Sequence, residues 1–331
     1  MRASIFFGLG ILVSACGGGD GVSIDGTTGS SSTASTSSSS SGGGGDGGSG
    51  GGGTGGGTSS HCMGKSPMAA GNTDVSIMSS GETREFRVHV PPGYDATKPV
   101  ALVIALHGYT QNIDDFMFIT HYAEVVDKRG MIVVFPKGKA PVGVPGWNAG
   151  SCCGSAQSQN TPDVQFMRDM VARIEEDYCI DPKRIFASGF SNGGMLSHRL
   201  ACEFSERIAA IGAVSGTMAI DPCIPKRPVP VLHIHGTSDI VVPYNNSIAA
   251  QTVPQTIDGW VARNFCQPEK SVVYSKGSAK CELYAQCNAD VELCTIDGGS
   301  HEWPAGGSAM GVGDLVASEY ILDFFEAHPM P

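Results

Sequence analysis

Residues 184–195, RIFASGFSNGGM, contain the stretch that decides the fold of this chain. A short apolar run ends at Ser188, and the five residues 189–193, GFSNG, lead into a segment that favours a helix. A G-x-S-x-G motif between a strand and a helix places the serine on a sharp turn that exposes its Oγ, because only small residues fit beside such a turn. The amino terminus of the helix also points backbone amides toward the same place. The motif therefore predicts Ser191 as a nucleophile.

Short β-branched runs alternate with amphipathic stretches on both sides of this motif. This alternation predicts an α/β domain in which helices flank a mostly parallel sheet. The expected strands are residues 84–90, 100–106, 131–135, 184–188, 208–214, 229–235 and 291–296. The expected helices cover residues 116–126, 167–174, a segment that starts near 192, 256–264 and 314–327. Residues 61–331 are predicted to form one such domain.

A serine hydroxyl needs a neighbouring base, and the base needs an orienting acid. In α/β-hydrolases, which this strand-turn-helix motif resembles, an acid and then a histidine follow the serine along the chain. Asp239 lies on a loop that leaves the expected strand 229–235, where open α/β sheets carry functional groups. Of the histidines after it, His301 lies in a Gly-rich loop and His328 at the chain end. We predict the triad Ser191, Asp239 and His301. Alternatives to Asp239 are Asp221, Asp258 and Asp297.

Acyl transfer also needs backbone amides aimed at the developing oxyanion. Tyr109 follows the end of an expected strand and Asn192 follows the nucleophile, so their N–H groups are the predicted donors. His107 is expected to brace its loop rather than transfer protons. His233 and His235 flank a strand end and are expected to be structural residues whose rings the backbone satisfies.

The first 60 residues differ from the rest of the chain and hold 21 of its 46 glycines. Residues 1–16 combine Arg2, an apolar run too short to span a bilayer, and Cys16, which predicts an export signal. The ending VSAC resembles a bacterial lipobox, so Cys16 is predicted to carry a lipid; an ordinary cleaved signal is the alternative. Residues 17–60 predict a disordered Gly/Ser-rich tether. The chain is thus expected to be secreted and anchored at the bacterial outer cell surface.

Eleven cysteines are present, and ten remain when Cys16 is set aside. An even number in an exported chain favours up to five disulfides over metal ligands. Cys152 and Cys153 are adjacent and are expected to bond to different partners, because a bridge between neighbours is strained. No C-x-x-C pair occurs, so neither a metal nor a cofactor is predicted. The net charge of −11 without basic runs argues against nucleic acid or anionic lipid as a partner, leaving the predicted lipid at Cys16 as the membrane contact.

Taken together, these residues resemble the esterases of carbohydrate esterase family one, which include feruloyl esterases, acetylxylan esterases and polyhydroxybutyrate-depolymerase-like proteins. The matching segments are LHGYTQN at 106–112, GWNAGSCCG at 146–154, YCIDPKRIFASGFSNGGM at 178–195, HGTSDIVVPY at 235–244 and GGSHEWPAG at 298–306. The resemblance implies the same triad of Ser191, Asp239 and His301. The start HCMGK at 61–65 and the cysteines at 179, 202 and 223 look most like the feruloyl-esterase branch.

Two positions depart from that family, and two tryptophans lie close to its motifs. Tyr109 stands where many relatives carry a small residue or cysteine, and Ser-His-Glu at 300–302 replaces the more usual Gly-His-Thr, so the mouth of the pocket is expected to differ. Trp147 and Trp303 are predicted to stack on an aromatic acyl group or a sugar ring. A role in the buried core is the alternative for Trp147.

The expected function is hydrolysis of a feruloyl or acetyl ester on a plant cell-wall polysaccharide such as xylan, through an acyl-enzyme on Ser191. One alternative is a polyhydroxybutyrate depolymerase or general carboxylesterase, with a polyester as substrate. Another is a surface-tethered binding lipoprotein that keeps the fold without activity. Labelling by a fluorophosphonate distinguishes this last alternative, because an intact triad reacts.

Overall fold

The computed structural model describes residues 62–246, 250–304 and 314–331. The predicted export signal, the predicted lipidation site Cys16 and the predicted tether lie outside the described residues. The strands are β1 (Gly71–Ser79), β2 (Glu82–Val90), β3 (Val100–Leu106), β4 (Ile132–Pro136), β5 (Ile180–Phe190), β6 (Ile211–Val214), β7 (Val231–Gly236), β8 (Lys270–Lys276), β9 (Ala279–Tyr284) and β10 (Val291–Ile296). The helices are α1 (Ile113–Thr120), α2 (Tyr122–Arg129), α3 (Gly154–Ser158), α4 (Asp163–Asp177), α5 (Asn192–Glu203), α6 (Val253–Arg263) and α7 (Ala317–Ala327). None of these helices has the length and apolar content that a membrane crossing needs.

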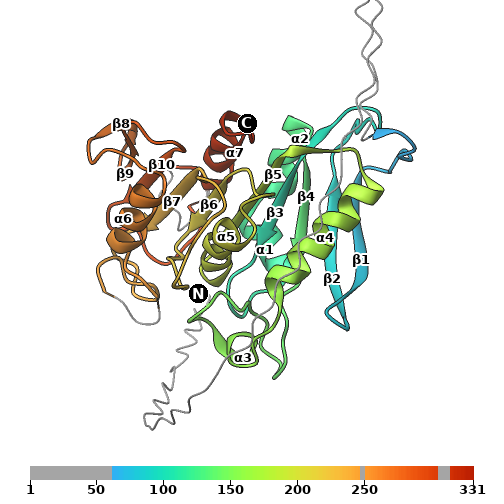
Figure 1. Ribbon diagram of the computed structural model, residues 1–331, viewed down its shortest axis with the longest axis horizontal. Coiled ribbons are helices and arrows are strands. Elements are labelled where there is room, and N and C mark those ends of the chain that lie inside the picture. The colour runs from blue at the N-terminus through green and yellow to red at the C-terminus, as the bar shows by residue number, and fades with distance from the viewer. Residues whose placement is uncertain (1–61, 247–249, 305–313) are drawn as a thin grey trace, which may run out of the picture. The chain divides into compact units, whose positions relative to one another are not determined.

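The described strands form one sheet in the order β1-β2-β4-β3-β5-β6-β7-β10-β9-β8 (Figure 1). Neighbouring strands from β4 to β10 are parallel. Antiparallel pairs extend the sheet at both ends. The prediction of an α/β-hydrolase domain with a mostly parallel sheet is confirmed. In such a sheet the carboxyl ends of the parallel strands meet along one edge, where functional loops gather.

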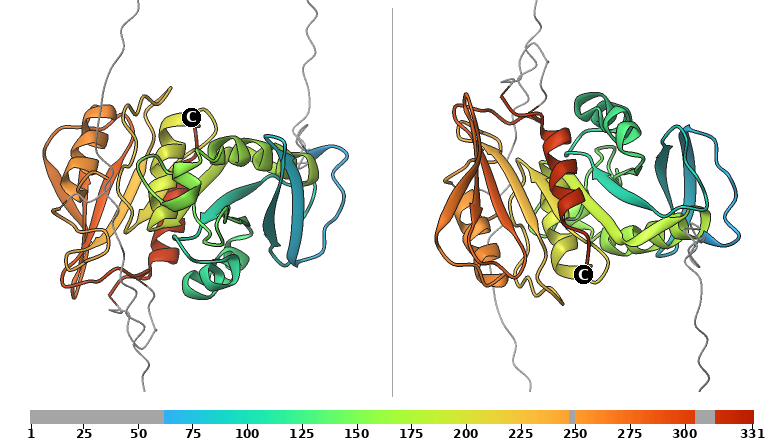
Figure 2. Two further views of the ribbon diagram at one scale, coloured as in Figure 1. Left: turned by 90° about the horizontal axis from the view of Figure 1, so that it is seen from below. Right: turned by 90° about the horizontal axis from the view of Figure 1, so that it is seen from above.

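Helices cover both faces of the sheet, which explains the continuous apolar runs of its central strands. In β3, Leu102, Ile104 and Leu106 pack into one core cluster with α4, α5 and α6. The alternate residues Ala101 and Val103 pack into a second cluster with α1, α2 and α7. Figures 1 and 2 show these two helical layers on opposite sides of the sheet. The core is therefore two apolar layers separated by the strands.

Apart from small shifts of element ends, two expected elements differ from the structure and three strands were not expected. The helix expected over residues 116–126 is two helices, because His121 adopts a left-handed conformation (φ 50°) between α1 and α2. The strand expected at 184–188 is longer, since α4 ends at Asp177 and β5 already begins at Ile180. β1, β8 and β9 were not predicted. The side chains of β8 are almost all exposed, so its sequence lacks the apolar pattern that identifies a strand.

Five disulfides join the ten cysteines of the described residues. The pairs are Cys62–Cys179, Cys152–Cys153, Cys202–Cys223, Cys266–Cys287 and Cys281–Cys294. The expected number is therefore confirmed. The expectation that Cys152 and Cys153 bond to different partners is wrong, because the other eight cysteines pair among themselves and these two pair with each other.

Candidate active site

Ser191 lies at the turn between β5 and α5, and the backbone on both sides fixes its position. It adopts φ 55° and ψ −119°, a conformation that is costly for a residue with a Cβ. Its amide donates to the Val214 carbonyl at 2.8 Å, which ties the turn to β6. A Cβ at Gly193 would stand 2.1 Å from the Leu106 carbonyl oxygen, and one at Gly189 would stand 2.4 Å from Gly193. The two glycines are thus required by close backbone contacts around the serine.

His301 and Asp239 reach Ser191 from two other strand ends. Asp239 follows β7, and His301 follows β10, the parallel neighbour of β7. His301 Nε2 lies 3.0 Å from Ser191 Oγ, and His301 Nδ1 lies 2.7 Å from Asp239 Oδ2. The ring of Phe190 packs at 4.9 Å between centroids against the imidazole of His301. The structure therefore brings the three predicted residues into one hydrogen-bonded line.

Asp239 is buried and its carboxylate is almost fully occupied by donors. Oδ1 accepts hydrogen bonds from the amides of Val241 and Val242, both at 2.8 Å. Oδ2 faces His301 and also lies 3.3 Å from His235 Nε2. Burial alone would raise the pKa of this carboxyl, but the hydrogen bonds from His235, His301 and the backbone outweigh it and hold the pKa well below its usual range. Asp239 is therefore a carboxylate at any pH near neutrality.

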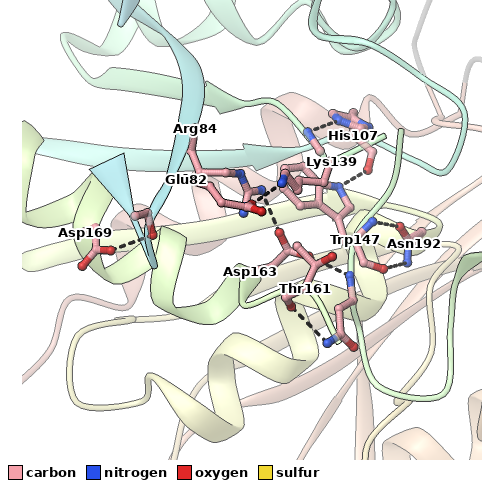
Figure 3. A network of polar contacts seen from close by, with 12 residues as sticks. Glu82, Arg84, His107, Lys139, Trp147, Thr161, Asp163, Asp169 and Asn192 are labelled. Atoms are coloured by element: carbon pink, nitrogen blue, oxygen red, sulfur yellow. Dashed lines mark hydrogen bonds and ion pairs between the residues drawn. The ribbon is translucent and has the colours of Figure 1, made fainter. Parts of the chain in front are cut away.

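Asn192, one of the two predicted oxyanion donors, is positioned by side chains that Figure 3 shows together. Within the described residues, neither the Tyr109 amide nor the Asn192 amide donates to another group, so both remain open to a ligand oxygen. The Asn192 side chain accepts from the Trp147 amide at 2.7 Å and donates to the Trp147 carbonyl at 3.1 Å. The residue after the nucleophile is thus fastened to the loop at 146–154.

That loop is anchored in turn by a buried ion pair (Figure 3). The Asn148 amide donates to Asp163 at 2.8 Å, and Arg84 donates to the other carboxylate oxygen of Asp163 at 2.8 Å. Arg84 and Asp163 are both buried. Burial raises the pKa of Asp163 more than Arg84 and the Asn148 amide lower it. We call Arg84, Asp163, Asn148, Trp147 and Asn192 the loop clamp.

His107 braces the neighbouring turn, as predicted. It is buried, its Nδ1 lies 2.8 Å from the Gly108 carbonyl, and its Nε2 accepts from the Gly138 amide at 2.9 Å. Burial lowers the pKa of His107 to about 4, so the ring is neutral at pH 7. Its Nδ1–H donates to the Gly108 carbonyl and its Nε2 lone pair accepts from Gly138, so the ring has neither a free proton to give nor a free lone pair to accept one.

Both predicted stacking tryptophans are buried. Trp147 is fully buried, and its indole N–H donates to the His107 carbonyl at 2.8 Å. This environment fits the alternative raised from the sequence, a core role. Trp303 is 6% exposed; its ring contacts Phe116 and Tyr122 edge-on and its N–H donates to Ser318. Neither indole offers an open face to a ligand. The motifs indicated that both tryptophans lie near the site, whereas their burial depends on packing against distant elements.

Sequence reasoning missed the surroundings of His233 and His235. Their rings are not satisfied by the backbone alone, because His233 bonds to the side chains of His198 and His235. This part of the expectation is wrong. The available signal was their spacing, since residues two apart on a strand lie on one face. The third ring comes from α5, which the spacing within β7 could not reveal.

An open cavity of about 680 Å³ has a lining that includes Met218, Ala219, Ile220, Gln251 and Gln255. Gly216, two residues before Met218, packs against the turn, since a Cβ there would stand 2.1 Å from the Ser191 carbonyl oxygen. The lining also includes the Asp221 carboxylate, and none of the three triad residues belongs to it.

One group of residues in the described ranges has the spacing of metal ligands: Cys281, Glu292 and Cys294. The two cysteines form a disulfide with each other. Because zinc and related ions bind thiolates, the oxidised pair does not provide a metal site. Glu292 instead accepts from the Tyr320 hydroxyl at 2.5 Å.

Comparison with known proteins agrees with this fold. Residues 94–264 match the phospholipase/carboxylesterase family of α/β-hydrolases. The chain belongs to this family. Feruloyl esterase C from Emericella nidulans is 30% identical over 252 residues, which cover 74% of this chain and 84% of that protein. Feruloyl esterase B from Piromyces equi is 34% identical over 235 residues, 66% of this chain.

The first relatives are much longer than the matched region. The aligned part spans 42% of the Piromyces protein, and 22% of a bifunctional acetylxylan esterase/xylanase from Neocallimastix patriciarum that is 32% identical over 164 residues, half of this chain. Among solved structures, an acetyl xylan esterase from Aspergillus awamori superposes with a TM-score of 0.54 at 15% identity, over 70% of this chain and 95% of that one. A CE1 ferulic acid esterase from Anaeromyces mucronatus, in complex with ferulic acid, superposes with a TM-score of 0.51 at 18% identity. The superposition covers 78% of this chain and 90% of that one. These structures share the fold of this carboxylesterase-family chain.

Proposed function

We propose that this chain is a serine carboxylic-ester hydrolase that forms an acyl-enzyme on Ser191. The observation that carries the proposal is the hydrogen-bonded line from Ser191 Oγ to His301 at 3.0 Å and from His301 to Asp239 at 2.7 Å. A base within hydrogen-bond reach of a hydroxyl, itself oriented by a carboxylate, is the arrangement that activates a serine. Family membership agrees with this chemistry.

In the proposed mechanism, His301 Nε2 takes the proton of Ser191 as Oγ attacks the ester carbonyl. The Tyr109 and Asn192 amides donate to the oxyanion of the tetrahedral intermediate. His301 then gives its proton to the leaving alkoxide, which departs as an alcohol. Water attacks the acyl-enzyme with His301 again as the base, and the acid product leaves while Ser191 regains its proton. Asp239 stays ionised throughout and stabilises the His301 imidazolium.

For the substrate, we propose a feruloyl ester, or an acetyl ester, on a plant cell-wall polysaccharide such as xylan. Support comes from the feruloyl esterases and acetylxylan esterase among the relatives. We also propose that the chain is exported and lipid-anchored at Cys16.

The test compares hydrolysis of methyl ferulate, acetylated xylan and hydroxybutyrate oligomers by the wild type and by Ser191→Ala. We expect methyl ferulate to have the highest kcat/KM, with loss of all three activities in the variant. A preference for hydroxybutyrate oligomers would instead favour a polyester depolymerase. Unchanged activity in Ser191→Ala would remove the proposed nucleophile. Anchoring is tested separately by detergent partitioning, which Cys16→Ala should abolish.

A further inference from the structure

Three buried histidines and one tryptophan form a continuous hydrogen-bonded line that ends at Asp239. Trp260 on α6 donates from Nε1 to His198 Nδ1 at 3.0 Å. His198 Nε2, on α5, lies 3.3 Å from His233 Nδ1 on β7, and His233 Nε2 lies 3.1 Å from His235 Nδ1. His235 Nε2 then faces Asp239 Oδ2 at 3.3 Å. We call His198, His233 and His235 the histidine chain; α5, α6 and β7 lie near one another in Figure 1.

The tryptophan fixes the direction of every hydrogen bond in this line. An indole N–H can only donate, so His198 Nδ1 must be an acceptor without a proton. A neutral His198 then carries its proton on Nε2 and donates to His233 Nδ1. The same reasoning places the proton of His233 on Nε2, and that of His235 on Nε2.

The opposite end of the line requires the same direction. His235 Nε2 lies 2.8 Å from the Val242 carbonyl oxygen and 3.3 Å from the Asp239 carboxylate. Both groups are acceptors, so the nitrogen between them must carry a proton. The reversed arrangement would leave a lone pair facing two oxygens, and would place two N–H groups against each other at Trp260 and His198.

Burial keeps His198 and His233 uncharged. His198 and His233 are fully buried. Burial lowers the pKa of His198 to about 3, although a hydrogen bond with the Gly216 carbonyl raises it in part and Arg263 lowers it further. Burial also lowers the pKa of His233 well below its usual value, helped by its two neighbouring histidines. Tyr244 contacts the His235 ring edge-on. The line therefore orients N–H dipoles without adding a charge.

We propose that the histidine chain and Trp260 are positioning residues that hold Asp239 toward His301 through a donor of fixed direction. His235 holds Oδ2 from one side, while the Val241 and Val242 amides hold Oδ1. Because His235 Nδ1 accepts from His233, its Nε2–H meets the carboxylate as a dipole and does not compete with the His301 imidazolium for the charge of Asp239. The proposal rests on the proposed catalytic role of Asp239.

The test is a double-mutant cycle between the two ends of the line. In Trp260→Phe only the Val242 and Asp239 end still imposes a direction, so the line is held less firmly and the His235 N–H is aimed less firmly at Asp239. We expect kcat for methyl ferulate to fall about tenfold with KM changed less than about twofold, since misplacement of a catalytic group acts on the transition state. In the His235→Gln background the Gln amide still offers an acceptor to His233 and a donor to Asp239. Trp260→Phe should then lower kcat less than about twofold.

This cycle separates positioning from packing. Trp260 is fully buried, so the Phe variant also loses stability, but it loses it equally in both backgrounds. Equal losses of kcat in the two backgrounds would overturn the proposal. His89→Gln serves as a control, because His89 is a buried histidine on β2 that bonds to Asn72 and Asp127 and should leave kcat unchanged.

A second measurement needs no substrate and remains decisive if the proposed function fails. Imidazole ¹⁵N spectra of the wild type should show all three histidines of the chain protonated on Nε2 alone near neutral pH. Trp260→Phe should add an Nδ1–H share to His198, because Trp260 is the donor in the line that keeps this nitrogen an acceptor. A wild-type ring protonated on Nδ1, or a charged ring, would refute the directional line. Failure of the esterase proposal would instead appear as absent hydrolysis and absent fluorophosphonate labelling in the wild type.

Discussion

The nucleophile and its base are held in place by different means. Ser191 is fixed by backbone: it sits between β5 and α5, its amide bonds to β6, and glycines at 189 and 193 allow strands and helix to meet around it. His301 and Asp239 lie on loops after β10 and β7, and side-chain hydrogen bonds determine where they point. The nucleophile side is thus built by the sheet, and the acid–base side by side-chain contacts on top of it.

This difference predicts which substitutions affect folding and which affect kcat. Around Ser191, a change of side chain beside the turn meets backbone within about 3 Å and acts on folding. Around Asp239, a change of donor leaves the fold intact and acts on the orientation of a carboxylate, and therefore on kcat.

The two sides should nevertheless act as one unit in chemistry. We expect Ser191→Ala and His301→Ala each to reduce kcat by about 10⁴-fold or more, and the double variant to lose no more than either single variant. Steady-state hydrolysis of methyl ferulate measures all three. Losses that multiply would show that the serine and histidine work independently.

Asp239→Asn should separate orientation from charge. The neutral amide keeps the size of the side chain but cannot stabilise the His301 imidazolium, so we expect kcat to fall about 10³- to 10⁴-fold. The melting temperature should change little in comparison, because the Val241 and Val242 amides can still donate to the remaining oxygen. A loss of folding instead of kcat would contradict the separation of the two sides.

The loop clamp on the nucleophile side should contribute to the free energy of unfolding. Arg84→Met leaves the buried Asp163 carboxylate without its cation, which should cost about 3–5 kcal/mol in the free energy of unfolding. Arg87→Met is the matched control, because the Asp74 and Asp114 carboxylates that it pairs with are largely exposed, and its cost should stay below about 1 kcal/mol. Urea unfolding measures both, and similar costs would count against the clamp.

The histidine chain should give the protein a stability that depends on pH. His198 has a folded pKa of about 3 against 6.5 for the free side chain, so the unfolded chain binds more protons between these values. The free energy of unfolding should therefore fall as the pH drops below 6.5, by up to about 1.4 kcal/mol per pH unit for each such histidine. His198→Gln should show a shallower slope in unfolding measured at several pH values; parallel curves would remove His198 as a cause.

The sequence by itself determined the α/β class, the turn at Ser191 and the order of the triad. These features are local or depend on chain order. A G-x-S-x-G motif between a strand and a helix requires one sharp backbone turn. His301 is one of only two histidines after Asp239. The central strands could be predicted because burial on both faces gives continuous apolar runs. Edge strands such as β8 have no such run, since one neighbour and solvent are all that they contact.

Only the tertiary structure decided what surrounds those residues. The bridge between Cys152 and Cys153, the burial of Trp147, the pair Arg84–Asp163 and the meeting of His198 with His233 all depend on which distant elements pack together. Sequence spacing shows which residues share a face of one strand or helix, whereas these contacts join residues from several elements. The physical reason is that a side-chain hydrogen bond or an ion pair is selected by burial and direction, and both are set by the assembled fold.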